Sequence, residues 1–200
     1  MKSKFAIFPV LLLLVLLFGA AFLYLFPLKT RFHGTPIDPP KPMGDFTLSS
    51  GNGPVSLGDF RGKYIILSFG YTSCPDVCPT TLAYFRQALD NLGKDANQVQ
   101  VIFVSVDWRR DTPEKTSAYV NHFGPEFIGL GGSQEQIDAV TKEFDIFYLL
   151  GIPDSVSNFY TVDHTATVQI LDREGNLVLT WPFGFTPSDY SDDLKMLLKN

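Results

Sequence analysis

The sequence predicts an α/β domain whose sheet has strands of mixed direction, preceded by one N-terminal transmembrane helix. Buried-strand patterns alternate with helix patterns between residues 64 and 144, which favours parallel strands joined by helices. Two later strand patterns flank a turn-rich segment and predict an antiparallel hairpin. Near the N-terminus, the 22 residues Phe5–Phe26 carry no charge, whereas a bilayer-spanning helix needs about 20 apolar residues.

The apolar segment Phe5–Phe26 is longer than the run of about 7 to 15 apolar residues in a cleaved signal peptide. We therefore expect an uncleaved membrane anchor over residues 1–28. The following residues 29–42 are rich in proline and show no periodicity, so they predict an extended tether. One folded domain, residues 43–200, then remains, which is long enough to bury a full hydrophobic core.

The chain carries a formal net charge of −5, and its charges are unevenly distributed. Residues 1–37 contain four basic side chains and no acidic ones, which leaves 12 basic and 21 acidic side chains in the remainder, a formal charge of −9. Nucleic-acid binding requires a basic surface, so this composition excludes a nucleic-acid partner. An acidic surface favours solubility and also suits a cationic partner.

Turn and capping signals divide the domain into its elements. The turn-rich segment 50–54 lies between two short strand patterns and predicts an opening β-hairpin. Thr112 followed by Pro113 predicts a capped helix start, and Ser133 with Gln136 has the spacing of a capping box. The predicted strands are 46–48, 55–57, 64–69, 99–106, 127–130, 165–171 and 177–180, and the predicted helices are 79–92, 113–122, 134–144 and 187–198.

The two cysteines of the chain, Cys74 and Cys78, lie in the tight loop between the strand pattern 64–69 and the following helix pattern. Each precedes a proline, and the residue before a proline is disfavoured in helical conformation. Since proline is favoured at the first helical position, we expect Cys78 to be the N-cap and Pro79 the first helical residue. A thiol at a helix N-terminus faces unpaired N–H groups, which lower its pKa. The sequence thus predicts sulfurs placed to react or to bind a soft metal.

Four uses of this cysteine pair stay open from the residues alone. A structural disulfide in so short a loop would contribute only about 2 kcal/mol, which a domain of this size hardly needs. A zinc site normally has four nitrogen or sulfur ligands, and the chain offers two cysteines and three histidines. A redox-active dithiol suits a strand–loop–helix junction, although C-x-x-x-C is one residue longer than C-x-x-C. Soft thiolates also select Cu(I), for which a third ligand would complete a trigonal site.

His164 is the natural candidate for that third ligand. It lies at the entry to a late strand, whose place in the sheet can bring it to the same end as the cysteines. A lone histidine is more often structural, so this assignment depends on the soft-metal pair upstream. In thioredoxin-type thiol oxidoreductases a cis proline normally occupies the loop before this strand, and this chain has no proline between Asp154 and Trp181. His164 stands where that proline would be expected.

Three groups of residues carry a family resemblance. They are Gly70-Tyr71-Thr72-Ser73-Cys74-Pro75-Asp76-Val77-Cys78-Pro79, then Val104-Ser105-Val106-Asp107 with Arg110-Asp111-Thr112-Pro113-Glu114, and Asp163-His164-Thr165. Through them the chain resembles the Sco (SenC-like) family of membrane-tethered copper proteins, which help assemble the copper centre of cytochrome c oxidase. The similarity covers about residues 43–199, with Trp108 where the family usually has proline.

The resemblance implies a thioredoxin-like fold and a copper site, for Cu(I), Cu(II) or both, formed by Cys74, Cys78 and His164. It also suggests supporting or partner-docking roles for Asp107 and Asp163, beside which simple capping and turn roles stay open. Cys74 and Cys78 would be the redox-active pair, since oxidation to a disulfide would prevent metal binding. The implied partners are the copper-binding subunit of cytochrome c oxidase and either a thiol reductant or another copper chaperone.

Two functional classes stay open: a copper-binding assembly factor, which is no enzyme, and a membrane-anchored thiol–disulfide oxidoreductase that keeps a client's cysteines reduced. A peroxide-reducing enzyme ranks lower because the chain shows no peroxidatic cysteine motif. Both leading classes require a compartment outside the cytoplasm. The N-terminal segment lacks the Arg- and Ser-rich character of a transit peptide. We therefore expect a single-pass protein of a bacterial inner membrane whose domain faces the periplasm.

Overall fold

The computed structural model describes residues 12, 17–18, 31–157 and 159–199. The chain divides into two compact units, Met1–Arg31 and Phe32–Asn200, and the second contains every element discussed below. Most of the predicted membrane anchor, Phe5–Phe26, lies outside the described residues, so the anchor stays a prediction. Within the part of the chain that is described, no helix combines the length and the apolar character that a membrane crossing requires.

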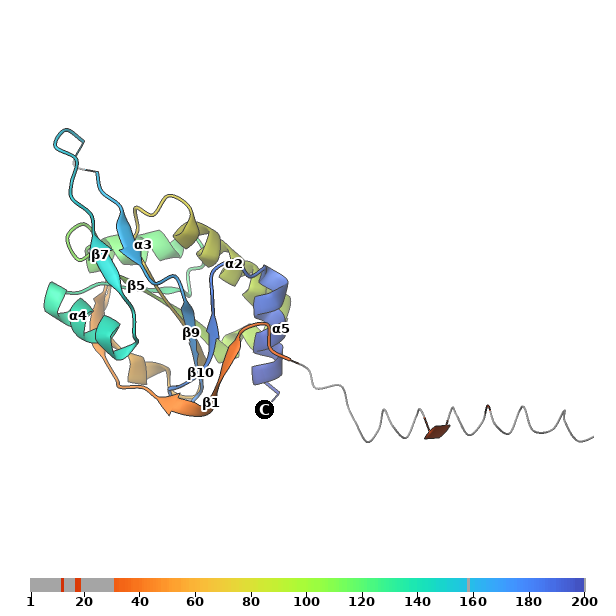
Figure 1. Ribbon diagram of the computed structural model, residues 1–200. Coiled ribbons are helices and arrows are strands. Elements are labelled where there is room, and N and C mark those ends of the chain that lie inside the picture. The colour runs from red at the N-terminus through yellow and green to blue at the C-terminus, as the bar shows by residue number, and fades with distance from the viewer. Residues whose placement is uncertain (1–11, 13–16, 19–30, 158, 200) are drawn as a thin grey trace, which may run out of the picture. The chain divides into compact units, whose positions relative to one another are not determined.

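A mixed sheet of six strands forms the centre of the domain. Its members are β1 (Thr35–Pro42), β4 (Tyr64–Gly70), β5 (Val99–Ser105), β6 (Ile128–Leu130), β9 (Val168–Leu171) and β10 (Asn176–Trp181). They lie in the order β1-β10-β9-β4-β5-β6 (Figure 1). Neighbours from β4 to β6 pair in parallel and the other neighbours pair antiparallel, so the predicted mixed sheet is confirmed. β4 and β5 are buried at every position, as expected for strands covered on both faces.

Helices cover the two faces of this sheet. They are α2 (Val77–Leu92), α3 (Pro113–Asn121), α4 (Gln134–Glu143) and α5 (Pro187–Leu197), with the short 3-10 helices η1 (Leu57–Phe60) and η2 (Gly93–Gln98). α2 and α5 pack together over one core, which contains the aromatic side chains of Phe85, Trp181 and Tyr190. α4 contributes Ile137 to a second core. Cys74 packs against both cores, so the cysteine loop lies where they meet.

Two of the predicted helix starts are confirmed by their caps. The Thr112 side chain accepts the backbone N–H of Lys115, with proline at the first position of α3. At α4, the Ser133 side chain accepts the backbone N–H of Gln136, and the Gln136 side chain accepts the backbone N–H of Ser133. The helix that matters for function, α2, begins differently from its prediction, as described below.

Two hairpins lie outside the central sheet. β2 (Thr47–Ser50) pairs with β3 (Gly53–Ser56), which confirms the predicted opening hairpin. β7 (Tyr148–Leu150) pairs with β8 (Val162–His164) in a second hairpin that the sequence does not predict, because each strand has only three residues. The strand predicted over 165–171 begins instead at Val168.

β1 belongs to the sheet, so the prediction of a free tether over residues 29–42 is wrong for this strand. Its prolines are tolerated because β1 is an edge strand, paired on one side with β10. Just before β1, Asp193 accepts the backbone N–H groups of His33 at 2.8 Å and of Gly34 at 2.9 Å. The folded domain therefore begins ahead of β1 and not at the predicted boundary.

Candidate metal and thiol site

The cysteine loop leaves the end of β4 and runs directly into α2. At Gly70, the last residue of β4, an added Cβ would lie 2.7 Å from Sγ of Cys78 and 2.7 Å from the ring of Phe103. A side chain at this position would displace either the sulfur or the ring. The missing side chain of Gly70 therefore gives the thiol its place against the end of the buried strand.

A cysteine sulfur accepts a hydrogen bond from the N-terminus of α2, and it belongs to Cys74 and not to the predicted Cys78. α2 begins at Val77 with Asp76 as N-cap, so the prediction that Cys78 is the N-cap and Pro79 the first helical residue is wrong. Proline is tolerated within the first turn because its missing N–H would have no intrahelical acceptor there. Cys78 is consequently helical and buried, and its backbone N–H donates to Sγ of Cys74 at 3.4 Å.

The two thiols have opposite acidities. The hydrogen bond from the Cys78 thiol, helped by the backbone N–H groups of Cys78 and Asp76, lowers the pKa of Cys74 to about 5. The same hydrogen bond, burial and the nearby Cys74 sulfur raise the pKa of Cys78. At neutral pH the pair thus shares one proton, with Cys74 as the thiolate and Cys78 as the thiol. Both cysteines are free, so this is the reduced form of the pair.

His164, the last residue of β8, faces this pair from across the sheet end. Its Nε2 lies 3.9 Å from Sγ of Cys78. Its Nδ1 lies 3.0 Å from the carbonyl oxygen of Thr165, which can only accept, so Nδ1 carries the proton. Nε2 then presents its lone pair toward the sulfur, as a metal ligand or a hydrogen-bond acceptor does.

Among the described residues, Asp163 makes no hydrogen bond to the His164 ring, so it does not support that histidine directly. Its side chain is exposed, and successive residues of a strand point to opposite faces. Among the described residues, the hydrogen-bond partner of His164 Nδ1 is the Thr165 carbonyl group, which orients the ring. Asp163 instead contributes a carboxylate to the rim of the site.

Asp107 is fully buried, so its carboxylate is not exposed for contact with a partner protein. Its carboxylate accepts from Tyr160 Oη at 2.7 Å and from Nε of Arg110. Arg110 also donates to the carbonyl oxygen of Tyr160 at 2.9 Å and stacks over its ring at 3.5 Å. Because Tyr160 lies two residues before β8, Asp107 and Arg110 hold the segment that leads to His164.

A second buried carboxylate, Asp111, holds the cysteine loop, and sequence analysis gave it no role of its own. It accepts from the backbone N–H of Thr72 at 2.7 Å, from Thr72 Oγ1 at 2.6 Å and from Ser105 Oγ at 2.7 Å. Lys115 pairs with the same carboxylate at 2.9 Å. Burial alone would raise the pKa of Asp111, but the hydrogen bonds from Ser105 and Thr72 outweigh it and lower the pKa. Asp111 is therefore a carboxylate that stays ionised while holding the loop two residues before Cys74.

The loop that follows β5 thus braces both halves of the site. Asp111 fixes the segment with the thiols, and Asp107 fixes the segment with the histidine. The sequence carried one usable signal for Asp111, its place after a buried strand in the loop that follows the Val104–Asp107 motif. It carried no comparable signal for Tyr160, whose role depends on the unpredicted hairpin.

An open groove of about 420 Å³ runs between the cysteine loop and β8. Among the described residues, no group of three or more His, Cys, Asp or Glu side chains is already arranged to hold a metal ion. With bonds of about 2.3 Å to sulfur and 2.0 Å to nitrogen, a trigonal metal would separate its two ligand atoms by about 3.7 Å. The observed 3.9 Å between Cys78 Sγ and His164 Nε2 is close to this value. The residues present therefore fit a soft metal ion that would be held by Cys78 and His164, with Cys74 as the third ligand.

Known proteins share this architecture. A SCO2-like protein of Rickettsia felis is 32% identical over 204 residues, covering 98% of this chain and 99% of its own. The structure of Bradyrhizobium japonicum ScoI with copper bound is 38% identical, covers 78% of this chain and 99% of its own, and superposes with a TM-score of 0.70. The thioredoxin domain of a thiol–disulfide oxidoreductase from Bacteroides vulgatus is 19% identical and covers 80% of this chain and 97% of its own. Its TM-score of 0.57 shows the fold alone, which is thioredoxin-like.

The family model described as SCO1/SenC matches residues 35–199, which include every residue of the candidate site and also β1. This match begins where the sheet begins, eight residues before the predicted domain boundary. The match over most of the chain and the relative of similar length lead to one conclusion: the chain belongs to the SCO1/SenC family.

Proposed function

We propose that this protein binds copper through Cys74, Cys78 and His164 and helps to metallate the copper centre of cytochrome c oxidase. The observation that supports this most directly is the approach of Cys78 Sγ and His164 Nε2 to 3.9 Å. Two soft sulfurs with one imidazole are a donor set that favours copper. The copper-bound relative from Bradyrhizobium japonicum supports the same cargo.

Proton release accompanies binding at such a site. Cys74 is already a thiolate near neutral pH, because its pKa is lowered to about 5. Cys78 carries a raised pKa and gives up its proton only when the metal takes over the charge. Copper affinity therefore falls as the pH falls, since protons compete for Cys78. The open groove leaves one side of the site accessible to a ligand from a receiving protein.

Thiol–disulfide exchange is the second candidate function, and the split acidity of the two thiols favours it. The Cys74 thiolate attacks one sulfur of a client disulfide and releases the other as a thiolate, which leaves a mixed disulfide. Cys78 then loses its proton, attacks Cys74 and releases the second client sulfur. The product is a Cys74–Cys78 disulfide, and the client has gained two electrons. A thiol reductant then has to supply two electrons and two protons to restore the dithiol.

The expected location follows from this proposed work and from the apolar N-terminal segment. We place the chain in a bacterial inner membrane, anchored through residues 1–28, with its domain in the periplasm. An anchored carrier remains close to a membrane-embedded oxidase. The carried ion is Cu(I), Cu(II) or both in turn.

Anaerobic copper titration of the reduced full-length chain in detergent tests the proposal. We expect one tightly held copper per chain, and its loss in Cys74→Ser and in Cys78→Ser. Stoichiometric copper retained by the double mutant would refute the metal site. The matched assay is reduction of an insulin disulfide, in which rapid turnover without copper binding would favour the oxidoreductase instead.

A further inference from the structure

Exposed apolar side chains are concentrated on the β7–β8 hairpin. In the described part of the unit Phe32–Asn200, six large hydrophobic side chains are exposed, and Phe183 is the one that lies elsewhere. The other five, which we call the hairpin surface, are Phe147, Leu149, Ile152, Val156 and Phe159. Ile152 and Val156 are 94% and 93% exposed, so they contribute little to the stability of this chain alone. A concentration of exposed large apolar side chains on one element is typical of a binding site.

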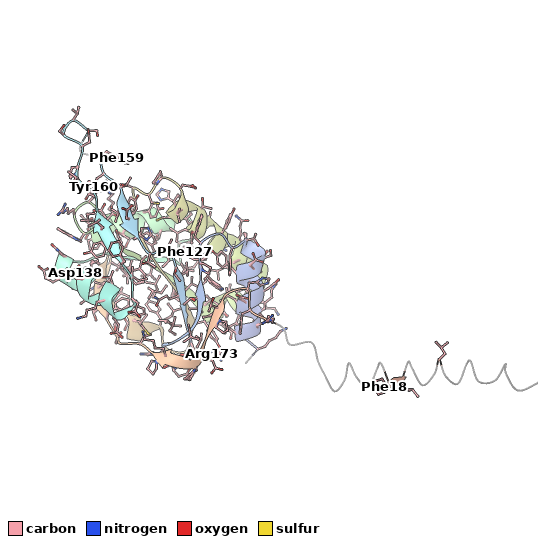
Figure 2. All side chains as sticks on the ribbon, viewed as in Figure 1. Phe18, Phe127, Asp138, Phe159, Tyr160 and Arg173 are labelled. Atoms are coloured by element: carbon pink, nitrogen blue, oxygen red, sulfur yellow. The ribbon has the colours of Figure 1, made fainter. Side chains whose placement is uncertain are left out.

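The hairpin surface is continuous with the candidate metal site. β8 ends in His164 and forms one wall of the groove that contains Cys74. Figure 1 shows the connection between β7 and β8 projecting beyond the body of the domain. Figure 2 shows Phe159 and Tyr160 at the stem of this projection, where Asp107 and Arg110 hold Tyr160. A protein that contacts the stem of the projection therefore lies next to the groove that contains Cys74.

The charges around the hairpin surface select the kind of partner. Residues 146–167 contain Asp154 and Asp163, both exposed, and no lysine or arginine. Asp76 adds a third exposed carboxylate across the groove. Two basic side chains lie beside the hairpin. Arg110 contacts Tyr160 and is paired with the buried Asp107, and Arg109 is exposed and stacks over the Trp108 ring. The exposed charges around the hairpin surface are therefore mainly acidic. An acidic rim around an apolar centre complements a protein surface with an apolar centre and basic side chains at its edge.

A lipid surface fits these features poorly. Bilayer surfaces that carry anionic lipids attract Lys and Arg and repel carboxylates. The hairpin also lies at the opposite end of the domain from the strand with which the folded chain begins (Figure 1).

We infer that the hairpin surface docks the protein that receives the metal, by an apolar contact ringed by lysine or arginine side chains of that protein. This rests on the proposed function, and it adds the surface and the chemistry of the partner. The hairpin surface contains none of the proposed copper ligands. Substitutions in it therefore change the rate of copper transfer to the partner and leave the copper affinity unchanged. Charge complementarity at the rim makes the encounter dependent on ionic strength.

The experiment measures copper transfer from the full-length chain in detergent to the soluble copper-binding domain of the cytochrome c oxidase subunit. The test variants are Ile152→Ser/Val156→Ser and Phe159→Ser, and the matched control is Phe183→Ser, whose ring is 51% exposed against 53% for Phe159. We expect unchanged copper affinity in all of them, at least a tenfold slower transfer from the hairpin variants, and wild-type transfer from the control. Amide hydrogen exchange over residues 148–157 should slow on adding the oxidase domain and not on reconstitution into vesicles.

The outcomes separate the two proposals. If the wild type transfers copper and the hairpin variants do so at the same rate, the docking inference is overturned and the proposed function stands. If the wild type binds copper but neither transfers it to the oxidase domain nor contacts that domain, the client is wrong and both proposals fail. Hairpin protection by vesicles alone would assign the surface to lipid and overturn the inference.

Discussion

Sγ of Cys78 and Nε2 of His164 lie 3.9 Å apart, although 86 residues separate them in the chain. Parallel pairing of β4 with β5 and antiparallel pairing of β4 with β9 set this approach at the level of the sheet. At the level of side chains, Gly70 gives the sulfur its place and the Thr165 carbonyl group orients the ring. The distance is therefore built into the fold.

His164→Ala should weaken copper binding by at least tenfold while leaving the dithiol able to form its disulfide. The imidazole is one of three proposed ligands, and the two sulfurs remain in place without it. Competition titration with a Cu(I) chelator measures the affinity, and thiol counting after mild oxidation measures the disulfide. His122→Ala is the control, because His122 bonds the Ala118 carbonyl group at the end of α3. Equal copper affinity in wild type and His164→Ala would remove the histidine from the site.

Alkylation should distinguish the two cysteines by pH. Since its pKa is lowered to about 5, Cys74 is a thiolate above that pH and should react with iodoacetamide at a nearly constant rate from pH 6 to 8. Below about pH 5 it gains a proton and its rate should fall. Cys78, buried and with a raised pKa, should stay unlabelled throughout. Mass spectrometry of labelled peptides gives both rates.

The control for this alkylation profile removes the largest cause of the shift. Cys78→Ala deletes the thiol that donates to Cys74, so the midpoint for Cys74 should move to higher pH. A wild-type rate that climbs tenfold per pH unit between pH 6 and 8 is the behaviour of an ordinary thiol with a pKa near 8.5, and it would contradict the prediction.

Local patterns predicted most of the fold, and long-range pairing explains what they missed. The buried runs in β4 and β5 and the caps at Thr112 and Ser133 are properties of a few neighbouring residues. β1 reads as a proline-rich tether because its stability comes from β10, more than 130 residues away. β7 and β8 are too short to show periodicity and become visible only as a pair.

In the candidate site, too, local patterns predicted some features, and long-range contacts set the features that were missed. Cys74, Cys78 and His164 were predicted from their chemistry and motif, and the structure brings Cys78 and His164 together and places Cys74 beside Cys78. Which cysteine is the acidic one was predicted wrongly, since α2 begins two residues earlier than predicted and Cys78 therefore lies inside the helix. The bracing role of Asp111 depends on contacts across 39 residues, which no local pattern contains.

Asp111→Asn should weaken copper binding by about 10- to 100-fold, as changes in groups that support metal ligands commonly do. An amide cannot accept from Thr72, Ser105 and Lys115 together, so the cysteine loop loses part of its anchorage. The reduction potential of the dithiol should shift as well, because the geometry of the two sulfurs changes. Equilibration with glutathione measures that potential. If Asp111 only stabilised the fold away from the cysteine loop, the reduction potential would keep its wild-type value.

The control for Asp111→Asn is Asp95→Asn, which removes an exposed carboxylate whose contact is with Gln98. This variant should keep the wild-type potential and copper affinity. An unchanged potential in a folded Asp111→Asn protein would show that the loop holds its geometry without that carboxylate.

Gly70→Ala should impair both thiol functions while the fold survives. The added Cβ meets the Cys78 sulfur and the Phe103 ring at 2.7 Å, so one of them has to move. We expect weaker copper binding and altered alkylation of the cysteine pair, with a loss of about 1–3 kcal/mol in the free energy of unfolding from overpacking. Gly53→Ala is the control for an added methyl group with open space around it, although its positive φ of 116° adds local strain. Wild-type copper affinity in Gly70→Ala would show that the ring, and not the sulfur, gives way.

The attachment of β1 shortens the reach of the domain from its proposed anchor. Asp193 fixes His33 and Gly34 and also accepts from Nε1 of Trp181 at 2.9 Å. Between the apolar segment and the first residue of the folded unit, the sequence leaves the five residues 27–31. Fully extended, they reach at most about 17 Å, compared with about 45 Å for the longer tether expected from sequence.

So short a connection should matter for an assembly factor and not for a diffusible reductase. An anchored carrier meets a membrane-embedded oxidase at high effective concentration, which a released domain loses. Replacing residues 1–28 by a cleavable export signal should therefore reduce the copper content and activity of the oxidase at native expression. Reduction of a soluble disulfide substrate should be unchanged, because the thiols are untouched. A glycine–serine insertion after Arg31 keeps the anchor but dilutes the domain over a larger volume, so its oxidase activity should fall between the two. If all three strains have equal oxidase activity, the anchor has no part in copper delivery, and a general thiol reductant becomes the stronger assignment.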